Sequence, residues 1–144
     1  MRSFAIAVLA ILALAAPAPA APLSGEAVVR TIAEDRVAVL IDSDHDQKID
    51  RGFLLSTDLP VAKTNVYFAA AELEFTDAYV RLTSESRLFD FHVAGHPEPP
   101  AAPTGARVVR FIGYALQHST GDGRCTLEQA RNGDAGACYS YGEK

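Results

Sequence analysis

The chain has 144 residues, of which 18 are acidic and 13 basic, and its formal net charge at pH 7 is −5. This length suits a single domain. The excess of acidic residues disfavours nucleic acid and anionic membranes as partners. We therefore expect a partner that is neither nucleic acid nor an anionic membrane, either an unknown protein or a small molecule. We expect the protein to be a monomer.

Residues 1–20 have the features of a secretory signal peptide. Arg2 supplies the positive start, residues 4–16 form an apolar run, and Ala18-Pro-Ala20 is an A-x-A cleavage site. The apolar run is shorter than the roughly 20 residues that span a bilayer. We therefore expect a single periplasmic or secreted domain over residues 21–144, with no membrane span after cleavage. The alternative is an uncleaved membrane anchor.

Most of the remaining chain has the short, β-branched and alternating apolar patterns of strands. The segment 61–71 is ambiguous, because Val66, Phe68 and Ala70 alternate while the alanines at 69–71 favour a helical turn. Strands are expected at residues 27–32, 37–41, 53–55, 73–75, 79–83, 88–93 and 107–116, the last of them a single long strand.

Prolines interrupt the chain at residues 97–103, and proline cannot join a central strand because it lacks an amide donor. We interpret this segment as a surface crossover within one domain, the alternative being a linker between two domains. About seven short strands without amphipathic helices predict a mainly β fold, a small antiparallel barrel or sandwich. A five-stranded barrel similar to the OB-fold is one option.

The tail, residues 119–144, is rich in glycine and contains the only two cysteines, Cys125 and Cys138. In an exported protein two cysteines indicate one disulfide, which would stabilise a loop of this size by roughly 3 kcal/mol. Thr126 is a candidate N-cap for a short helix over residues 127–132 that Gly133 ends.

The segment with the most specific chemistry is the acidic loop, residues 42–50, between two apolar runs. Asp42, Asp44, Asp46 and Asp50 place four carboxylates within nine residues. Calcium takes six to eight oxygen ligands, and aspartates at alternate positions of a tight loop can converge on one ion. Because the flanking runs are expected strands, this loop is predicted to join a β-hairpin.

The DxDxDxxxD pattern resembles the calcium loops of EF-hands, dockerin repeats and thrombospondin type 3 repeats, over residues 42–53 only. The resemblance implies side-chain ligands from Asp42, Asp44 and Asp46, a backbone carbonyl from Lys48, and Asp50 at the position that often binds through water. It also implies that the residue after Lys48, an isoleucine, anchors the loop by burial.

Two positions depart from the EF-hand pattern. Gln47 stands where glycine usually provides positive φ, and Phe53 stands where a bidentate glutamate completes the ligand set. Water or a distant acid would have to supply the remaining ligands, the candidates being Asp58, Glu72 and Glu74. The sequence therefore predicts weak, structural calcium binding with a Kd of about 10⁻⁴ to 10⁻³ M.

Other readings of the chain stay open at this point. The acidic loop could be a solvated turn whose aspartates cap backbone amides, or a metal-free recognition surface for a basic partner. A small hydrolase is a third possibility, although the sequence contains no G-x-S-x-G motif. A pocket that joins a histidine to two acids would be the sign of such an enzyme. We expect a non-enzymatic domain.

Overall fold

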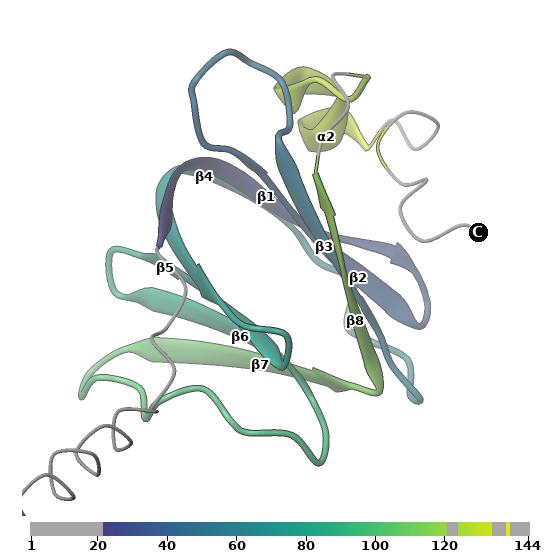
Figure 1. The fold of residues 1–144 in the computed structure, drawn as a ribbon, viewed down its shortest axis with the longest axis vertical. Helices are drawn as coiled ribbons and strands as arrows, with labels where there is room; N and C mark the ends of the chain where they lie inside the picture. Colours follow the sequence, from purple (N-terminus) through teal and green to yellow (C-terminus); the bar gives the residue numbers. More distant parts are fainter. Residues whose placement is uncertain (1–21, 121–123, 134–137, 139–144) are drawn as a thin grey trace, which may run out of the picture.

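The computed structural model describes residues 22–120, 124–133 and 138. Strands account for most of this part of the chain (Figure 1). The elements are β1 (Leu23–Ala33), β2 (Arg36–Asp42), β3 (Arg51–Ser56), β4 (Asn65–Phe75), β5 (Tyr79–Ser84), β6 (Arg87–Val93), β7 (Arg107–Gly113), β8 (Ala115–Thr120) and α2 (Leu127–Asn132).

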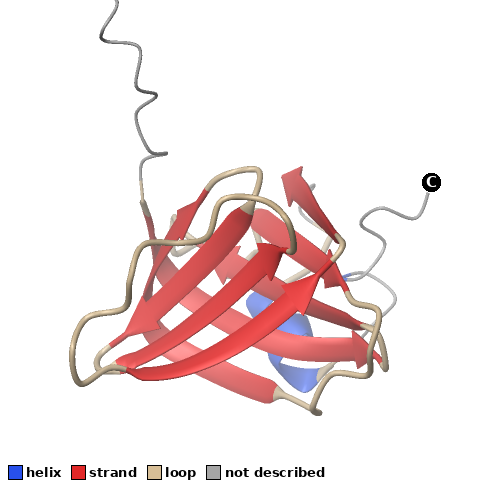
Figure 2. Ribbon diagram, turned by 90° about the horizontal axis from the view of Figure 1, so that it is seen from below, coloured by secondary structure: helices blue, strands red, loops and turns tan. Residues whose placement is uncertain are grey.

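All eight strands form one sheet in the order β7-β6-β5-β4-β1-β2-β3-β8. Neighbouring strands are antiparallel except β6 and β7, which are parallel and are joined by the crossover that contains residues 97–103. The sheet is strongly curved, so that one of its faces is concave and forms the inside of the molecule (Figures 1 and 2). It is not closed as a barrel, because β7 and β8 end the hydrogen-bonded order. The predicted mainly β fold is confirmed, with eight strands in place of the five of an OB-fold.

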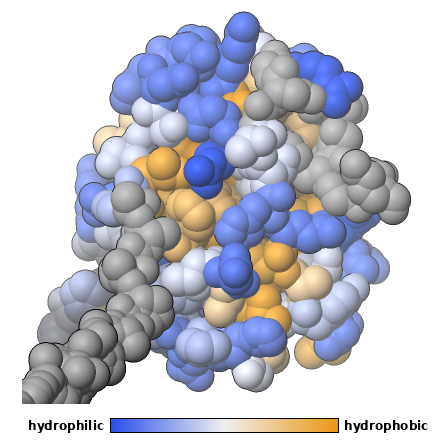
Figure 3. Space-filling view, in the orientation of Figure 1, coloured by the Kyte–Doolittle hydropathy of each residue, from blue (hydrophilic) through white to orange (hydrophobic). Residues whose placement is uncertain are grey.

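The inner face of the curled sheet holds the main hydrophobic core. Alternate residues of each strand point inward, as the period of two in a strand requires. Figure 3 shows apolar side chains in the middle of this view, where the ribbon of Figure 1 leaves a gap. The largest fully buried side chains of this core are Phe53, Phe91, Ile41, Leu55, Leu73 and Leu82.

The structure resolves one ambiguous segment and shows that one local prediction is wrong. Residues 69–71 do not form a helical turn but lie within β4, where Ala71 is buried and pairs with Gly25. Pairing with β1 overrides the helix propensity of alanine. The expected single strand 107–116 is two strands, because the chain bends at Tyr114, directly after Gly113, and passes from one end of the strand order to the other. A Cβ at Gly113 would lie 2.2 Å from the Ser56 carbonyl oxygen, so this corner requires glycine.

A second, smaller hydrophobic core lies between the sheet and the C-terminal segment, meaning residues 124–133 and 138. The disulfide between Cys125 and Cys138 is present, as predicted. Helix α2 has the predicted bounds: Thr126 forms a capping box with Gln129, and Gly133 ends the helix in the left-handed conformation. This second core consists of Val28, Leu40, Ile49, Cys125, Leu127, Ala130 and Cys138, with Tyr67 packed against it.

The proline-rich crossover passes over a buried ion pair. The Arg81 guanidinium donates two hydrogen bonds to the Asp90 carboxylate, at 2.7 and 3.0 Å, and a third to the Pro100 carbonyl. Arg81 and Asp90 are both buried.

None of the helices in the described part of the chain is long and apolar enough to span a membrane. The signal peptide predicted at residues 1–20 lies outside the described residues.

Candidate metal site

The acidic loop joins β2 to β3, so the predicted hairpin is confirmed. The last pair of residues before the loop is Ile41 with Arg51. Beyond it, the Asp50 N–H donates a hydrogen bond to the Ile41 carbonyl at 3.0 Å. At the β2 end, a Cβ at Gly25 would lie 2.1 Å from the Asp42 carbonyl oxygen. Glycine at position 25 therefore allows β1 to approach the first aspartate of the loop closely.

Three of the four predicted aspartates come together. Asp42, Asp44 and Asp50 each offer one carboxylate oxygen, and these oxygens lie within 4.8 Å of one another. Asp42 is fully buried, Asp50 is half-buried and Asp44 is exposed. Such a group could hold a metal ion, with the exposed side open to water ligands. Among the described residues, Asp58, Glu72 and Glu74 do not join this group.

Asp46 does not belong to this group of three. Its Oδ1 accepts a hydrogen bond from the Lys48 N–H at 2.9 Å, and its own N–H donates to Asp42 and Asp44, both at 3.3 Å. The backbone of Lys48 forms an isolated antiparallel β-bridge with Thr126 of the C-terminal segment. The ligand roles that the resemblance implies for Asp46 and Lys48 stay predictions.

The aspartates also order the loop through its backbone. Asp42 Oδ2 accepts from the Gln47 N–H at 2.8 Å, and Asp50 Oδ2 accepts from the Ser43 N–H at 2.8 Å. The Ser43 hydroxyl donates to Asp50 Oδ1, also at 2.8 Å. These are the bonds expected of a turn in which aspartates cap backbone amides. The same carboxylates therefore shape the loop and supply its cluster of oxygens.

The tight turn has a backbone cost. Gln47 has φ of 70° and His45 has φ of 59°, so both are left-handed. The sequence predicted positive φ at Gln47, where an EF-hand has glycine, but gave no sign of it at His45. Each left-handed residue costs on the order of 1 kcal/mol, which the hydrogen bonds to the aspartates offset.

The electrostatics of the cluster favour a cation. Burial raises the pKa of Asp42 above its ordinary value of 3.8, and the side chains of Asp44 and Asp46 raise it further. The backbone N–H groups of Gln47 and Asp46 act in the opposite direction, as hydrogen bonds to a carboxylate do. The ionised form of the buried Asp42 carboxylate is thus destabilised, and a bound divalent cation would stabilise it.

The C-terminal segment holds the far side of the loop, a contact that the sequence did not reveal. The Ile49 N–H donates to the Cys125 carbonyl at 2.9 Å, and the Leu127 N–H donates to the Gln47 carbonyl at 2.9 Å. Ile49 is 1% exposed and belongs to the second core, which confirms its predicted anchoring role. The only signal in the sequence was the presence of a disulfide, whose docking surface no local pattern specifies.

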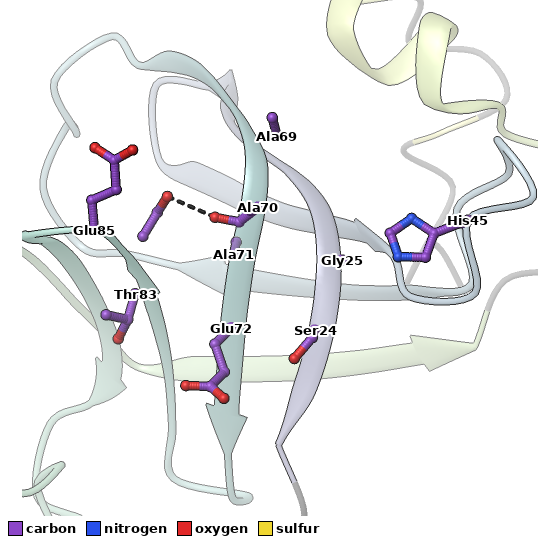
Figure 4. A pocket seen from close by; sticks show the side chains of 10 residues that line it. Ser24, Gly25, His45, Ala69, Ala70, Ala71, Glu72, Thr83 and Glu85 are labelled. Carbon is purple, nitrogen blue, oxygen red and sulfur yellow. Dashed lines mark hydrogen bonds between the residues drawn. The ribbon is translucent and has the colours of Figure 1, made fainter.

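A separate pocket of about 430 Å³ lies on the outer face of the sheet (Figure 4). His45, Glu72 and Glu85 are among its lining residues, so it contains a histidine and two acids. In Figure 4, His45 lies at one end, with β1 and β4 between it and Glu85. The hydrogen bond in this view joins the Ser84 hydroxyl to the Ala70 carbonyl at 2.7 Å. The pocket therefore has the composition that would mark a small hydrolase, and that alternative stays a prediction.

Comparisons with protein-family models, with curated proteins and with solved structures found no match to this chain.

Proposed function

We propose that this protein is an exported, non-enzymatic domain, periplasmic or secreted, whose β2–β3 loop binds one structural calcium ion. The proposal rests on the convergence of the Asp42, Asp44 and Asp50 carboxylate oxygens within 4.8 Å. Oxygen-only ligands suit a hard cation such as calcium better than zinc or copper. The ion would neutralise the clustered carboxylates and stabilise the folded loop.

Two features favour weak binding over a regulatory switch. Three carboxylates supply only part of the six to eight oxygens that calcium takes, so water completes the ligand set. The loop is also held by its own hydrogen bonds and by the C-terminal segment, so the ion has little conformational change to drive. We expect a Kd of about 10⁻⁴ to 10⁻³ M, the range of extracellular calcium modules.

The Cys125–Cys138 disulfide supports the exported location. Disulfides form and persist in the periplasm and outside the cell. Weak calcium sites of the expected affinity are also typical of extracellular modules.

The test is the melting temperature in EDTA and in calcium or magnesium at about 10 mM. For the expected Kd range, calcium stabilises by about 1.4 to 2.7 kcal/mol, which is on the order of 5 to 10 °C in a domain of this size. Magnesium should have a smaller effect, because it demands octahedral geometry and loses water reluctantly.

Two neighbouring variants sharpen the test. Asp44→Asn removes an exposed carboxylate from the group of three and should abolish the calcium shift. Asp46→Asn is the matched control, since this exposed aspartate lies outside that group and its amide oxygen can still accept from Lys48. An equal loss in both variants would make Asp46 a ligand, as the EF-hand resemblance implies.

A metal-free binding module is the second candidate function, because every aspartate of the loop already accepts a backbone hydrogen bond. On this account neither calcium nor Asp44→Asn changes the melting temperature appreciably, and the acidic loop serves a basic partner instead.

A further inference from the structure

Among the described strands, β7 ends the sheet and pairs only with β6. The Arg107 N–H donates a hydrogen bond to the Ser86 carbonyl, and the Gly113 carbonyl accepts one from the Ala94 N–H. The backbone groups of both residues therefore point toward β6. Backbone groups alternate in direction along a strand. The N–H and C=O groups of the even-numbered residues 108, 110 and 112 therefore point to the open edge, where no described strand pairs with them.

Apolar side chains accompany this open edge. Val109 is 42% exposed, Ile112 is 54% exposed, and Tyr114 directly after the strand is 57% exposed. Together with Leu59 they are the exposed large hydrophobic residues of the described chain. An edge strand with exposed apolar side chains and unpaired backbone groups is a template for a further strand.

The usual structural protections of an edge are missing from β7. The strand contains no proline, and its register with β6 runs without a bulge from Arg107 to Gly113. Its protection is charge: Arg107 and Arg110 are both exposed. In an antiparallel pair centred on this strand, Arg110 would face Arg110 of a second copy, and like charges directly opposite are destabilising. The arginines disfavour self-association and favour an acidic strand.

We infer that the β7 edge is a docking surface for an extended, acidic segment of a partner protein, which adds as a ninth strand. The open backbone groups at Val108, Arg110 and Ile112 would pair with its main chain, and Arg110 would pair with its carboxylates. Arg110 and Ile112 lie on one face of β7 and Val109 on the other. In a segment whose acidic and aliphatic residues alternate, the exposed side chain of Val109 would therefore contact the aliphatic positions. This proposal is independent of calcium, because it uses no residue of the acidic loop.

The first experiment uses two capped heptapeptides as probes, Thr-Val-Glu-Val-Glu-Val-Thr and its counterpart with lysines in place of both glutamates. The amide spectrum of the ¹⁵N-labelled full-length protein reports binding. We expect the glutamate peptide to shift the amides of Val108, Arg110 and Ile112 and to bind at least tenfold more tightly than the lysine peptide. The net charge of −5 would favour the opposite order, so non-specific attraction cannot produce this result.

Two variants test the two parts of the interaction. Arg110→Glu should reverse the preference between the peptides, whereas Lys63→Glu, at an exposed cation outside β7, should leave it unchanged. Ile112→Pro removes only an outward N–H and leaves the bonds to β6 intact, so it should weaken the glutamate peptide at least tenfold, and Ile112→Ala less.

The proposal is overturned if neither peptide shifts the β7 amides, or if the lysine peptide binds as tightly. It is also overturned if sedimentation shows a dimer that Ile112→Pro dissolves, because a second copy would then occupy this edge. The Arg110→Glu result decides the matter even if Ile112→Pro does not fold.

Discussion

Replacing Ile49 with alanine tests how the acidic loop is held. The side chain is 1% exposed and packs in the second core with Cys125, Leu127 and Ala130. The change removes three carbons, worth about 0.8 kcal/mol each, and leaves a cavity. We therefore expect a loss of about 3 kcal/mol in the free energy of unfolding, within the range for buried isoleucine, and a fall of roughly 10 °C in melting temperature.

Urea unfolding of the oxidised protein measures this loss, and Leu59→Ala is the control. Leu59 is 75% exposed, so removing a side chain of the same size should cost less than about 0.5 kcal/mol. The Ile49 variant should also speed hydrogen exchange at its own amide, which donates to the Cys125 carbonyl. A loss below 1 kcal/mol would refute the packing of the loop against the C-terminal segment.

Three further changes probe other parts of the fold. Cys125→Ala should cost about 3 kcal/mol, the value expected for a loop closed by a disulfide of this span, and denaturant unfolding without reductant would measure it. Asp90→Ala leaves the Arg81 charge buried and unpaired and should cost about 3 to 5 kcal/mol; a loss below 1 kcal/mol in urea unfolding would contradict this. The hydrogen bond to Glu26 and, after it, burial raise the pKa of Tyr67 above 10.0, which favours the neutral phenol in the folded state. This contribution to stability is therefore complete below about pH 10 and is lost as pH rises through the higher folded pKa. Tyr67→Phe should reduce the alkaline loss, and melting at about pH 9 to 12 would show an unchanged slope if the account is wrong.

The sequence predicted those parts of the fold whose signals are local. The hairpin around the acidic loop follows from two short apolar runs, and helix α2 from a capping threonine and a terminating glycine. The disulfide follows from the cysteine count in a chain that is expected to be exported. Three of the four predicted aspartates, Asp42, Asp44 and Asp50, come together in one cluster, because they lie close together in the sequence of a tight loop.

Features that depend on distant contacts were not predictable in the same way. Ala71 lies in a strand because β1 pairs with it, although alanine favours a helix. Position 113 requires glycine because the Ser56 carbonyl oxygen approaches it closely, which no neighbouring residue reveals. The contact between Gln47 and the N-terminus of α2 joins segments about eighty residues apart. Such contacts are set by how the whole sheet curls.

The most direct test of the central claim is a calcium titration of the ¹⁵N-labelled protein followed through its amide spectrum. We expect saturation at one ion per chain, with the largest shifts at the amides of Ser43, Asp44 and Gln47, which donate to the carboxylates of Asp42 and Asp50. Their shifts should give one Kd of about 10⁻⁴ to 10⁻³ M. Amides of the loop that do not move in about 10 mM calcium would contradict the account and leave the loop as an aspartate-capped turn.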